Sequence, residues 1–502
     1  MPLDLSPFSD AGLDNATLAT LLDTHRAADA PRLTRLWRYY RNPVLNERDA
    51  RTGAVRRRLA QIAGLPSRLT QPVPDDDRHP TEREIVIEND IAWRLHTLLD
   101  LMLGRPPVLL STSPDEETRA AVQAILDAVL ENAGGIALLQ DAALLSSVFG
   151  HVDFLLRAED LFTTPIPTSA RNDPRAAIEF ARLLRVEVIE PTRAIPVLSP
   201  DDFRQLSVYI IHFTRPSTAT GGAWASPGRQ SLLAGLRDRL NIAAPTPTTE
   251  GVLELFSATH HQRYEDGRLV FDSPNPIGVL PVVHIQNLTQ PFRYEGLSEV
   301  EPLIPLQDEL NTRLSDRANR VTLQSFKLLL AKGLEDDAPV RAVSPGQVWM
   351  TSNPDASIQA FGGDAASPSE DNHIQQIREA MDKTSTVNPL AAGLIRARVG
   401  QLSSENALRI TLLGALNKTT RKQVAFGKGL AHLAELILRA LDRVGLFPTT
   451  PADRGVTVQW PDPIPRNERD RLDAARLKIE LGVPRERVLA ELGYAPNENA
   501  IT

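Results

Sequence analysis

The chain has 502 residues, of which 42% are hydrophobic and 24% charged, as is typical of a soluble globular protein with several packed modules. It contains no cysteine, which excludes disulfides, thiolate metal sites and cysteine nucleophiles. Its formal net charge is −8 and its pI is about 5.8, the reverse of what a protein that grips nucleic acid by neutralising phosphates would show.

Two features of the sequence bear on where the protein is made. No apolar run is long enough to span a bilayer. The first residues, MPLDLSPFSDAGLD, lack the basic and apolar regions of a secretory signal. We therefore expect a protein that is cytosolic when it is synthesised.

The first part of the chain predicts helices and then a polar loop. Residues 11–42 indicate two helices that end in LWRYYRN, an aromatic cluster more typical of a helix end packed on the body than of a ligand site. Asn42 follows this cluster, and asparagine tolerates a left-handed turn. The segment 51–77 is polar, and its three adjacent aspartates, 75–77, indicate a solvated loop rather than a metal site.

The following residues change between helical and strand patterns. A helix is predicted within 84–110, because its apolar spacing stops at Gly104 and two prolines follow. Strands at 254–264 and 268–271 flank a hairpin turn at 265–267, where glycine supplies a positive φ. His260 and His261 are adjacent on the first strand, so their side chains point to opposite faces and cannot readily share a metal. The other predicted segments are helices at 115–131 and 136–148, a strand at 150–156, two strands within 185–213, and a loop at 214–249 with a helix near 230–240.

The stretch 281–333 is the most informative part of the sequence. It begins as an apolar β-type run, turns at Asn287 and continues as an amphipathic helical segment. Pro302 and Pro305 place the start of a regular helix near the latter, and Ser298 with Glu301 forms a capping-box pattern. The predicted buried face of this helix comprises Val300, Leu303, Ile304, Leu310, Leu314, Ala318 and Val321. The predicted exposed face comprises Asp308, Glu309, Arg313, Asp316, Arg317 and Arg320.

The remaining third predicts a small module followed by helices. Short strand candidates at 327–331, 347–351 and 357–361 form a region too small for an independent enzyme domain. A second capping-box pattern at 367–370 opens a helix whose apolar face carries Ile374, Ile377 and Met381. The other predicted segments are a glycine-bearing loop at 390–404, a long helix at 404–444 with Gly414, Gly427 and Gly429 as possible bends, a strand at 456–461, and terminal helices at 466–492.

Motifs of the common enzyme classes do not occur. The run 427–429, GKG, lacks the upstream glycine and the following serine or threonine of a phosphate-binding P-loop. There is no GxSxG, HExxH, GxGxxG after a strand, or EF-hand loop, and the ten histidines show no metal-ligand spacing. We expect no cofactor and no metal. An enzyme built on dispersed carboxylates remains a less favoured alternative.

The order of features in 281–333 resembles the entry to the stem of portal proteins of tailed bacteriophages, in the siphophage-like portal family. The resemblance is carried by a strand ending at Asn287, then Gly-Leu-Ser-Glu-Val, Leu-Gln-Asp-Glu-Leu-Asn and Ser-Asp-Arg-Ala-Asn. The resemblance also includes a helix that begins after Asn89 and ends at a Gly-x-Pro pattern, which starts at Gly104. The resemblance runs from Leu36 to the C-terminus. It implies an α+β portal fold with a β-rich and helical wing, a two-helix stem, a small α/β clip, a long spine helix and a helical C-terminal crown.

The resemblance also implies boundaries for these parts. The expected division is 1–297 for the N-terminal wing, 298–326 for the first stem helix, 327–366 for the clip, 367–388 for the second stem helix, 389–404 for the tunnel loop, 405–462 for the spine helix and wing strand, and 463–502 for the C-terminal helices of the crown.

The function implied by the resemblance is structural, not enzymatic. Such a portal is a homo-oligomeric ring, usually dodecameric, at one capsid vertex, and double-stranded DNA passes through its channel in packaging and ejection. The implied partners are the major capsid protein or scaffold, the terminase large subunit and the head-tail adaptor, with no membrane. The protein would assemble in the host cytoplasm and reside in the virion. Another phage head protein, such as a head-tail adaptor or scaffold, is the alternative.

Two groups of residues are candidates for functional contacts. The family places the tunnel loop at the channel constriction, where the candidates for sparse DNA contacts are Arg396, Arg398 and Gln401. Salt bridges between neighbouring subunits are an equally good interpretation of the two arginines. The clip meets the packaging motor and adaptor in relatives, and its candidates for partner contact are Glu335, Asp336, Asp337 and Trp349.

Overall fold

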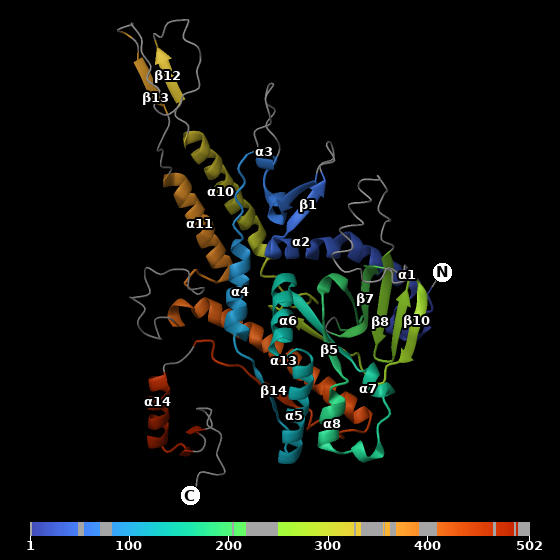
Figure 1. Cartoon of the computed structure of the whole chain (residues 1–502). Helices are drawn as coiled ribbons and strands as arrows, with labels where there is room; N and C mark the ends of the chain where they lie inside the picture. Colours follow the sequence, from blue (N-terminus) through green and yellow to red (C-terminus); the bar gives the residue numbers. More distant parts are fainter. Residues whose placement is uncertain are drawn as a thin grey trace, which may run out of the picture. The chain divides into compact units, whose positions relative to one another are not determined.

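The computed structural model describes residues 3–48, 55–70, 83–202, 205–216, 249–325, 328–332, 355, 357–361, 368–390, 409–464, 468–485 and 488–489 (Figure 1). The chain divides into two compact units. Unit 1 comprises Met1–Thr34, Arg94–Glu299 and Thr386–Thr502, and unit 2 comprises Arg35–Trp93 and Val300–Ser385. The chain passes from one unit to the other four times, so each unit is assembled from segments that are distant in sequence.

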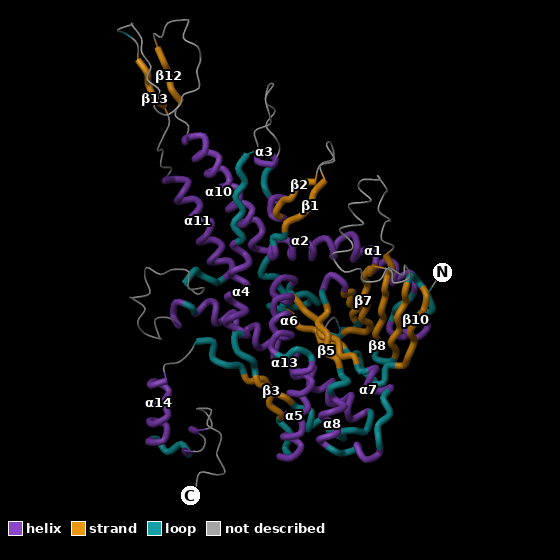
Figure 2. The backbone as a smooth tube through the Cα atoms, in the orientation of Figure 1, coloured by secondary structure: helices purple, strands orange, loops and turns teal. Residues whose placement is uncertain are grey.

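Unit 1 contains two antiparallel sheets that pack on each other. The larger has the strand order β10-β9-β8-β7-β6 and the smaller β11-β4-β5 (Figure 2). Their strands are β4 (His151–Arg157), β5 (Arg185–Ile189), β6 (Ala194–Leu198), β7 (Leu206–Pro216), β8 (Thr249–Ser257), β9 (His260–Glu265), β10 (Arg268–Pro274) and β11 (Val282–Gln286). Side chains alternate between the faces of a strand, so Tyr209 and Ile211 of β7 face Leu155 and Val282 of the smaller sheet.

The other face of the larger sheet is covered by the N-terminal segment. Val208 and Ile210 of β7 pack there against Phe8 and Leu18. These two residues belong to a 3-10 helix, η1 (Ser6–Ala11), and to α1 (Asn15–Thr24). After α1 a single π-helical turn leads directly into α2 (Ala30–Arg41). The two helices predicted within 11–42 are therefore confirmed, joined without a loop.

A helical layer covers the outer face of the smaller sheet. Its main element is α13 (Leu413–Arg443), whose Phe426 and Leu430 pack with Phe154 of β4 and with Val283 and Ile285 of β11 in one core. The other helices of unit 1 are α4 (Asp90–Leu103), whose first turn belongs to unit 2, α5 (Glu116–Asn132), α6 (Ile136–Phe149), α7 (Glu159–Thr163), α8 (Pro174–Ala181) and α14 (Glu468–Glu480). A further strand pair joins β3 (Val108–Ser111) to β14 (Val456–Gln459).

Unit 2 is built around two long helices. These are α10 (Ile304–Ser325), which a short 3-10 turn precedes, and α11 (Pro368–Ser385). The strand pair β12 (Leu328–Lys332) and β13 (Ser357–Phe361) lies between them in the chain. The unit also contains α2 from Arg35 onward, β1 (Val44–Arg48) paired with β2 (Val55–Leu59), a 3-10 turn (Ala60–Gly64), α3 (Ser67–Thr70) and the first turn of α4.

Several predicted elements are confirmed, because residues close in sequence determine where they begin and end. α4 ends at Leu103, directly before Gly104, and α5 begins after its N-cap Asp115, whose carboxylate accepts the Thr118 amide at 2.8 Å. The hairpin turn between β9 and β10 has positive φ at Asp266 (47°) and Gly267 (74°). The start of the helix near Pro305 and the strands at 327–331 and 357–361 are also confirmed, each within one residue.

Other predictions are wrong where distant contacts decide the local structure. The strand predicted at 254–264 is two strands, since the chain reverses between Ser257 and His260. A strand, β2, occupies part of the predicted polar loop. The Ser298 hydroxyl donates to the Val148 carbonyl at 2.6 Å instead of capping, and the 3-10 turn begins after Val300 with no side-chain cap. Of the predicted long helix at 404–444, residues 404–408 lie outside the described residues and residues 409–411 are helical. After a turn at Leu412, α13 continues from Leu413 to Arg443 without interruption at its glycines. The predicted loop at 214–249 is shorter, since β7 continues to Pro216 and β8 begins at Thr249. Residues 217–248, the predicted strand at 347–351 and Ser367 lie outside the described residues.

Two searches of the described residues concern membranes and metals. Within these ranges no single helix is long and apolar enough to cross a membrane, although α5 and α6 together, with a 69° bend between them, would be by length and composition. No group of three or more histidine, aspartate or glutamate side chains in the described ranges could hold a metal ion.

Gly429 allows α13 to lie directly on β11, and its substitution tests this packing. A β-carbon at Gly429 would lie 2.2 Å from Cδ1 of Ile285, whereas one at Gly427 would have only ordinary contacts, at 3.6 Å from Trp460 Nε1. We expect G429A to destabilise unit 1 by about 1–3 kcal/mol through overpacking. G427A is the matched control and should stabilise by up to about 1 kcal/mol through helix propensity. Urea unfolding of both variants measures the difference, and equal stabilities would contradict the packing.

Candidate functional site

The two long helices of unit 2 are the candidate functional element. They run antiparallel (Figure 1). Ion pairs join them, because Arg317 contacts Asp371 at 3.0 Å and Arg320 pairs with Glu370. Ile374, Ile377 and Met381 of α11 are buried, as the sequence predicts. In the sequence, α10 is followed by β12, then β13, then α11, so the strand pair connects the two helices.

Every arginine of the helix pair has a carboxylate partner. Their pairings are Arg313 with Glu309 at 2.7 Å, Arg317 with Asp371, Arg320 with Glu370, and Arg378 with Glu88 at 2.7 Å. Such half-exposed pairs contribute little stability. They do neutralise the arginines of these helices, so the guanidinium groups are already engaged within the unit.

The buried face of α10 differs from the prediction in its second half. Leu303, Ile304 and Leu310 are buried as expected, but Val321 is 51% exposed. The buried positions beyond Leu310 are instead polar. They belong to a stripe of residues spaced by four, of which the first three are completely buried: Gln307, Asn311, Ser315 and Asn319. We call these four residues the polar stripe.

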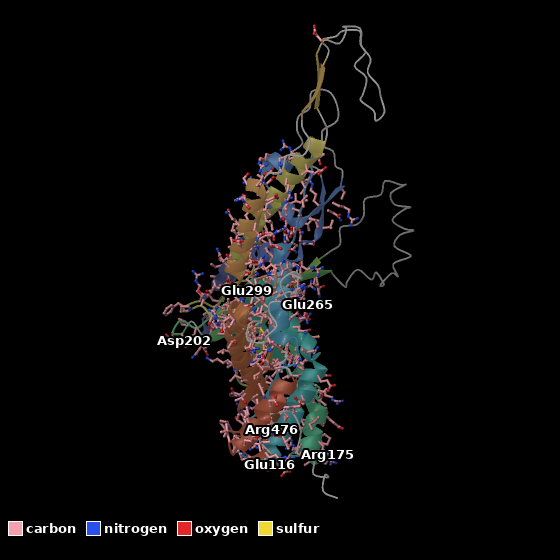
Figure 3. All side chains as sticks on the ribbon, turned by 90° about the vertical axis from the view of Figure 1, so that its left-hand side faces the viewer. Glu116, Arg175, Asp202, Glu265, Glu299 and Arg476 are labelled. Atoms are coloured by element: carbon pink, nitrogen blue, oxygen red, sulfur yellow. The ribbon has the colours of Figure 1, made fainter. Side chains whose placement is uncertain are left out.

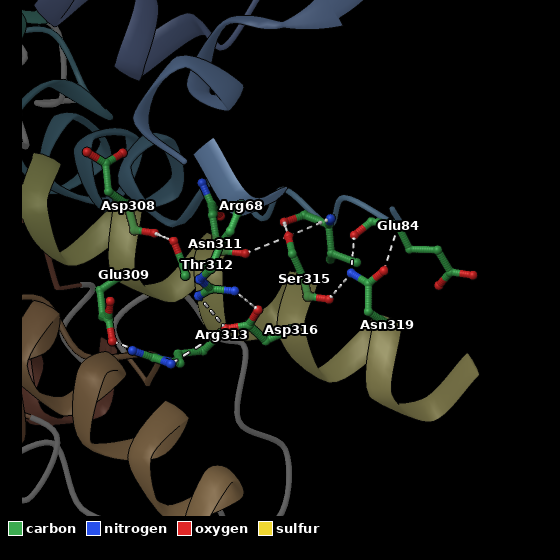
Figure 4. A network of polar contacts seen from close by, with 11 residues as sticks. Arg68, Glu84, Asp308, Glu309, Asn311, Thr312, Arg313, Ser315, Asp316 and Asn319 are labelled. Carbon is green, nitrogen blue, oxygen red and sulfur yellow. Dashed lines mark hydrogen bonds and ion pairs between the residues drawn. The ribbon is translucent and has the colours of Figure 1, made fainter. Parts of the chain in front are cut away.

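The polar stripe binds the backbone of the extended segment 84–90 (Figure 4). In chain order, the Glu84 amide donates to Asn319 Oδ1 at 3.0 Å, Val86 to Ser315 Oγ at 3.0 Å, Glu88 to Asn311 Oδ1 at 3.1 Å, and Asp90 to Gln307 Oε1 at 3.0 Å. Side-chain amides return bonds to the carbonyls, from Asn319 to Glu84 at 2.8 Å and from Gln307 to Glu88 at 2.5 Å. The segment therefore has a hydrogen-bonded ladder whose partner is a helix instead of a strand.

The ladder works because two periods nearly coincide. Four residues of a helix rise about 6 Å, and two residues of an extended chain advance about 6.6 Å. Each step of four along α10 thus meets the next same-facing amide of the segment, in the opposite direction. Side chains of different length, from glutamine to serine, accommodate the remaining mismatch.

The ladder continues into a buried amide network. Asn311 Nδ2 donates to Gln61 Oε1 at 3.0 Å, and the Gln61 amide group donates to the Tyr39 carbonyl at 2.7 Å and to Asn89 Oδ1 at 3.0 Å. Asn42 has the left-handed φ expected for it, 43°, and its Oδ1 accepts the Gln61 backbone amide at 3.0 Å. An asparagine at this position therefore does more than tolerate the turn, because glycine would leave that amide without this acceptor.

Removing one member of the polar stripe tests the ladder. N311A takes away the acceptor of the part-buried Glu88 amide and the donor of the buried hydrogen bond to Gln61, so we expect a loss of about 2–4 kcal/mol in stability. The Glu88 amide should also lose hydrogen-exchange protection. N319A is the matched control, since its bonds are exposed, and should cost less than about 1 kcal/mol. Equal losses of stability and of exchange protection in the two variants would rule out the buried ladder as described.

The sequence-predicted contact residues cannot be placed in this framework. Glu335, Asp336, Asp337 and Trp349 lie outside the described residues, between β12 and β13. Arg396, Arg398 and Gln401 also lie outside them, between the end of α11 and the start of α13. Their roles stay predictions.

A buried ion cluster in unit 1 lies at the point where the chain leaves for α10. Glu299 is the last residue of unit 1 before Val300, and its amide donates to the Ser147 carbonyl at 2.8 Å (Glu299 is labelled in Figure 3). Its carboxylate accepts from Lys418 Nζ at 2.6 Å and lies 3.8 Å from Lys422 Nζ. Lys422 also donates to Ser147 Oγ at 2.7 Å. Two lysines of α13 thus fix the chain directly before the helix pair.

The charges of this cluster do not balance, which gives it a pH dependence. Burial lowers the pKa of Lys422 to about 8, against the opposing effect of Glu299. Because the unfolded chain then binds more protons between pH 8 and 10.5, stability rises with pH in that window. We expect a gain of about 1–2 kcal/mol between pH 7.5 and 9.5 in the wild type and none from this source in K422M.

Replacing Glu299 should lower the stability of the protein more than replacing Lys422 does. E299Q leaves two buried ammonium groups without a carboxylate, and we expect it to cost about 3–5 kcal/mol at pH 7. K422M, which keeps the Lys418–Glu299 pair, should be near neutral or stabilising. Urea unfolding at the two pH values compares the three proteins. A K422M protein less stable than E299Q would contradict this assignment.

A second buried cluster has the residue types of an acid–base site but not its chemistry. Asp153 is fully buried between the two sheets and accepts from the Tyr209 and Tyr294 hydroxyls at 2.7 and 2.8 Å. His284 Nδ1 lies 2.7 Å from Asp153 and its Nε2 lies 2.7 Å from the Tyr294 carbonyl. Both ring nitrogens therefore have hydrogen-bond partners inside the protein. Neither nitrogen is left to exchange a proton with a bound molecule, so the geometry indicates a structural role.

Sequence reasoning missed the polar stripe and both buried clusters. The spacing of Gln307, Asn311, Ser315 and Asn319 is visible in the sequence, because amides and a hydroxyl recur every four residues. Helical periodicity applied to apolar residues alone does not detect it. Lys418 and Lys422 recur at the same spacing on α13, but their partner, Glu299, is more than a hundred residues away.

Comparisons with known proteins identify the family. The model of the family described as "Phage portal protein, SPP1 Gp6-like" matches residues 246–499, just over half of the chain. No curated protein matches. The chain is 13% identical to a chain in the structure "Neck of empty GTA particle computed with C6 symmetry", over 80% of this chain and 89% of that one, with a TM-score of 0.45. It is 12% identical to a chain in "Virion of native gene transfer agent (GTA) particle", over 81% and 90%, with a TM-score of 0.40.

The family match confirms the resemblance drawn from residues 281–333 and decides against an enzyme, since these proteins are structural components of virions. The chain belongs to the SPP1 Gp6-like family of phage portal proteins.

Proposed function

We propose that this chain assembles into a closed, dodecameric ring at one capsid vertex, with a central channel for DNA packaging and ejection. The family membership is the observation that carries the proposal. On this interpretation α10 and α11 are the two stem helices and the segment between them, with β12 and β13, is the clip. Residues before α10 form the wing, residues 389–404 the tunnel loop, α13 the spine helix, and α14 part of the crown.

The electrostatics of the helix pair support a channel that guides DNA instead of gripping it. Duplex DNA presents about one charge per 1.7 Å, and only about 6–10 neutralised phosphates already give strong, salt-dependent binding. All the arginines of α10 and α11 are engaged with carboxylates. The net charge of −8 also argues against a strongly basic wall. Sparse cationic contacts would then come from the tunnel loop, where Arg396 and Arg398 are the candidates.

The proposed partners follow from the family and from the part of the ring that each would meet. The clip, with Glu335, Asp336, Asp337 and Trp349, is the proposed contact for the terminase large subunit during packaging and later for a head-tail adaptor. The wing and crown would face the capsid protein or scaffold.

Electron microscopy and native mass spectrometry of the purified protein test the ring. We expect closed rings with a central channel, and only monomers and dimers under many conditions would overturn the proposal. The variant with both R396A and R398A should form the same rings but alter DNA packaging or retention, with little change in bulk DNA affinity. Normal packaging and retention by this double variant would remove the two arginines from the mechanism without affecting the ring.

A further inference from the structure

The loop 288–297, between β11 and the helix pair, is firmly held at its base. The Leu297 amide donates to the Leu288 carbonyl at 3.0 Å and closes the loop. Gln286 Nε2 donates to the carbonyls of Arg293 and Tyr294 at 2.8 and 2.9 Å. Tyr294 is further fixed through the buried Asp153 cluster, and the adjacent Glu295 pairs with Arg32 at 2.5 Å. The loop is thus pre-organised within unit 1.

This loop presents an aromatic side chain to solvent from a strained backbone. Phe292 has a φ of 61° and is 80% exposed. A residue with a β-carbon in this conformation costs about 1–3 kcal/mol, and such strain persists where the surroundings impose it. A rigid loop with an exposed aromatic tip has the properties of a binding hot spot, because little entropy is lost when it is covered.

A cationic groove lies beside this aromatic tip. It has a volume of about 760 Å³ and is bounded by the loop, β11 and one side of α13. The basic side chains that line it are His284, Arg293, Lys428 and His432, and none of its lining residues is an aspartate or glutamate. The surface formed by Phe292, Arg293 and Lys428, here called the loop face, therefore suits a partner that is apolar and acidic.

A surface of this kind occurs on the same unit, at the edge strand β10. Leu269, Val270 and Phe271 are exposed by 45%, 52% and 36%. The exposed Asp266 and Asp272 flank them, with one cation, Arg268, at the start of the strand. Among the described strands β10 pairs only with β9. Three consecutive exposed apolar residues on a sheet edge are a site of association unless another chain covers them.

The form of the β10 edge favours side-chain contact over strand addition. The pairing of β10 with β9 passes from Leu269 opposite Tyr264 to Phe271 opposite Arg263, so Val270 is an extra residue in a bulge. A bulge interrupts the regular row of amides and carbonyls that a further strand would need. We call Leu269, Val270 and Phe271, with Asp266 and Asp272, the edge face.

We propose that the loop face of one copy of this chain packs against the edge face of the next copy in the ring. Phe292 covers the apolar residues of β10, while Arg293 and Lys428 face Asp266 and Asp272. The two faces are different surfaces of one chain, so the contact is heterologous and repeats from copy to copy, as ring closure requires. This inference rests on the proposed ring.

Cross-linking tests the contact directly, because the chain has no cysteine and any introduced pair is unique. We expect rings of the F292C/V270C double variant, treated with a short bismaleimide, to give a ladder of covalent multimers on denaturing gels. Rings of F292C/L477C are the matched control, since Leu477 of α14 is also exposed, at 58%, and should give no ladder. Intact rings of F292C/V270C without a ladder would overturn the inference.

Assembly of charge and apolar variants supplies the second readout. We expect F292D to lower the yield of rings about tenfold or more while circular dichroism shows a folded chain. K428E should lower the yield less, and K428E/D272K should restore part of it. Unchanged ring yields for F292D would contradict the contact but leave the ring itself in place. If the wild-type chain forms no rings at all, both the proposed function and this contact fall.

Discussion

The helix–segment ladder of unit 2 is the interaction on which the arrangement of α10 depends. The extended segment 84–90 pairs with no strand in the described residues, yet its amides become progressively buried toward Asp90 and need acceptors. The polar stripe supplies them from a helix, which is possible only because four helical residues and two extended residues have nearly the same rise. The buried face of α10 must therefore be polar, and it fixes both the rotation of the helix and the register of the segment.

The same constraint applies in unit 1, where buried polar groups must also have hydrogen-bond or ion-pair partners. Asp153 joins both sheets and the loop 288–297 through two hydroxyls and an imidazole. Glu299 joins α13 to the chain that leads into the helix pair. A misplaced partner would leave a charge buried alone, which costs far more than a lost apolar contact. These clusters therefore specify one arrangement of segments that are distant in sequence.

The sequence predicted the elements whose ends are encoded locally, such as α4 at Gly104, α5 at Asp115 and the hairpin at Gly267. The predictions failed where a residue distant in sequence determines the hydrogen bonding or the burial of a side chain. The Ser298 hydroxyl has the pattern of a cap but bonds Val148, and Val321 has helical spacing with the apolar face but is exposed, because the segment 84–90 requires the polar side of α10. Hydrophobic periodicity assumes that what is buried is apolar, and the polar stripe breaks that assumption. The predicted DNA and clip contacts lie outside the described residues, so their geometry stays a prediction.

Net charge illustrates the same limit in the electrostatics of the helix pair. The value of −8 shows that acidic residues outnumber basic ones, but it does not tell whether the arginines of α10 and α11 are available. That depends on the antiparallel register, which sets Arg317 and Arg320 beside Asp371 and Glu370. A shift of one helix by a single turn would separate these partners by about 5.4 Å and leave unpaired guanidinium groups. The polar stripe sets the register of α10 against the segment 84–90, and Arg378 of α11 pairs with Glu88 of that segment at 2.7 Å, so the same segment holds both helices.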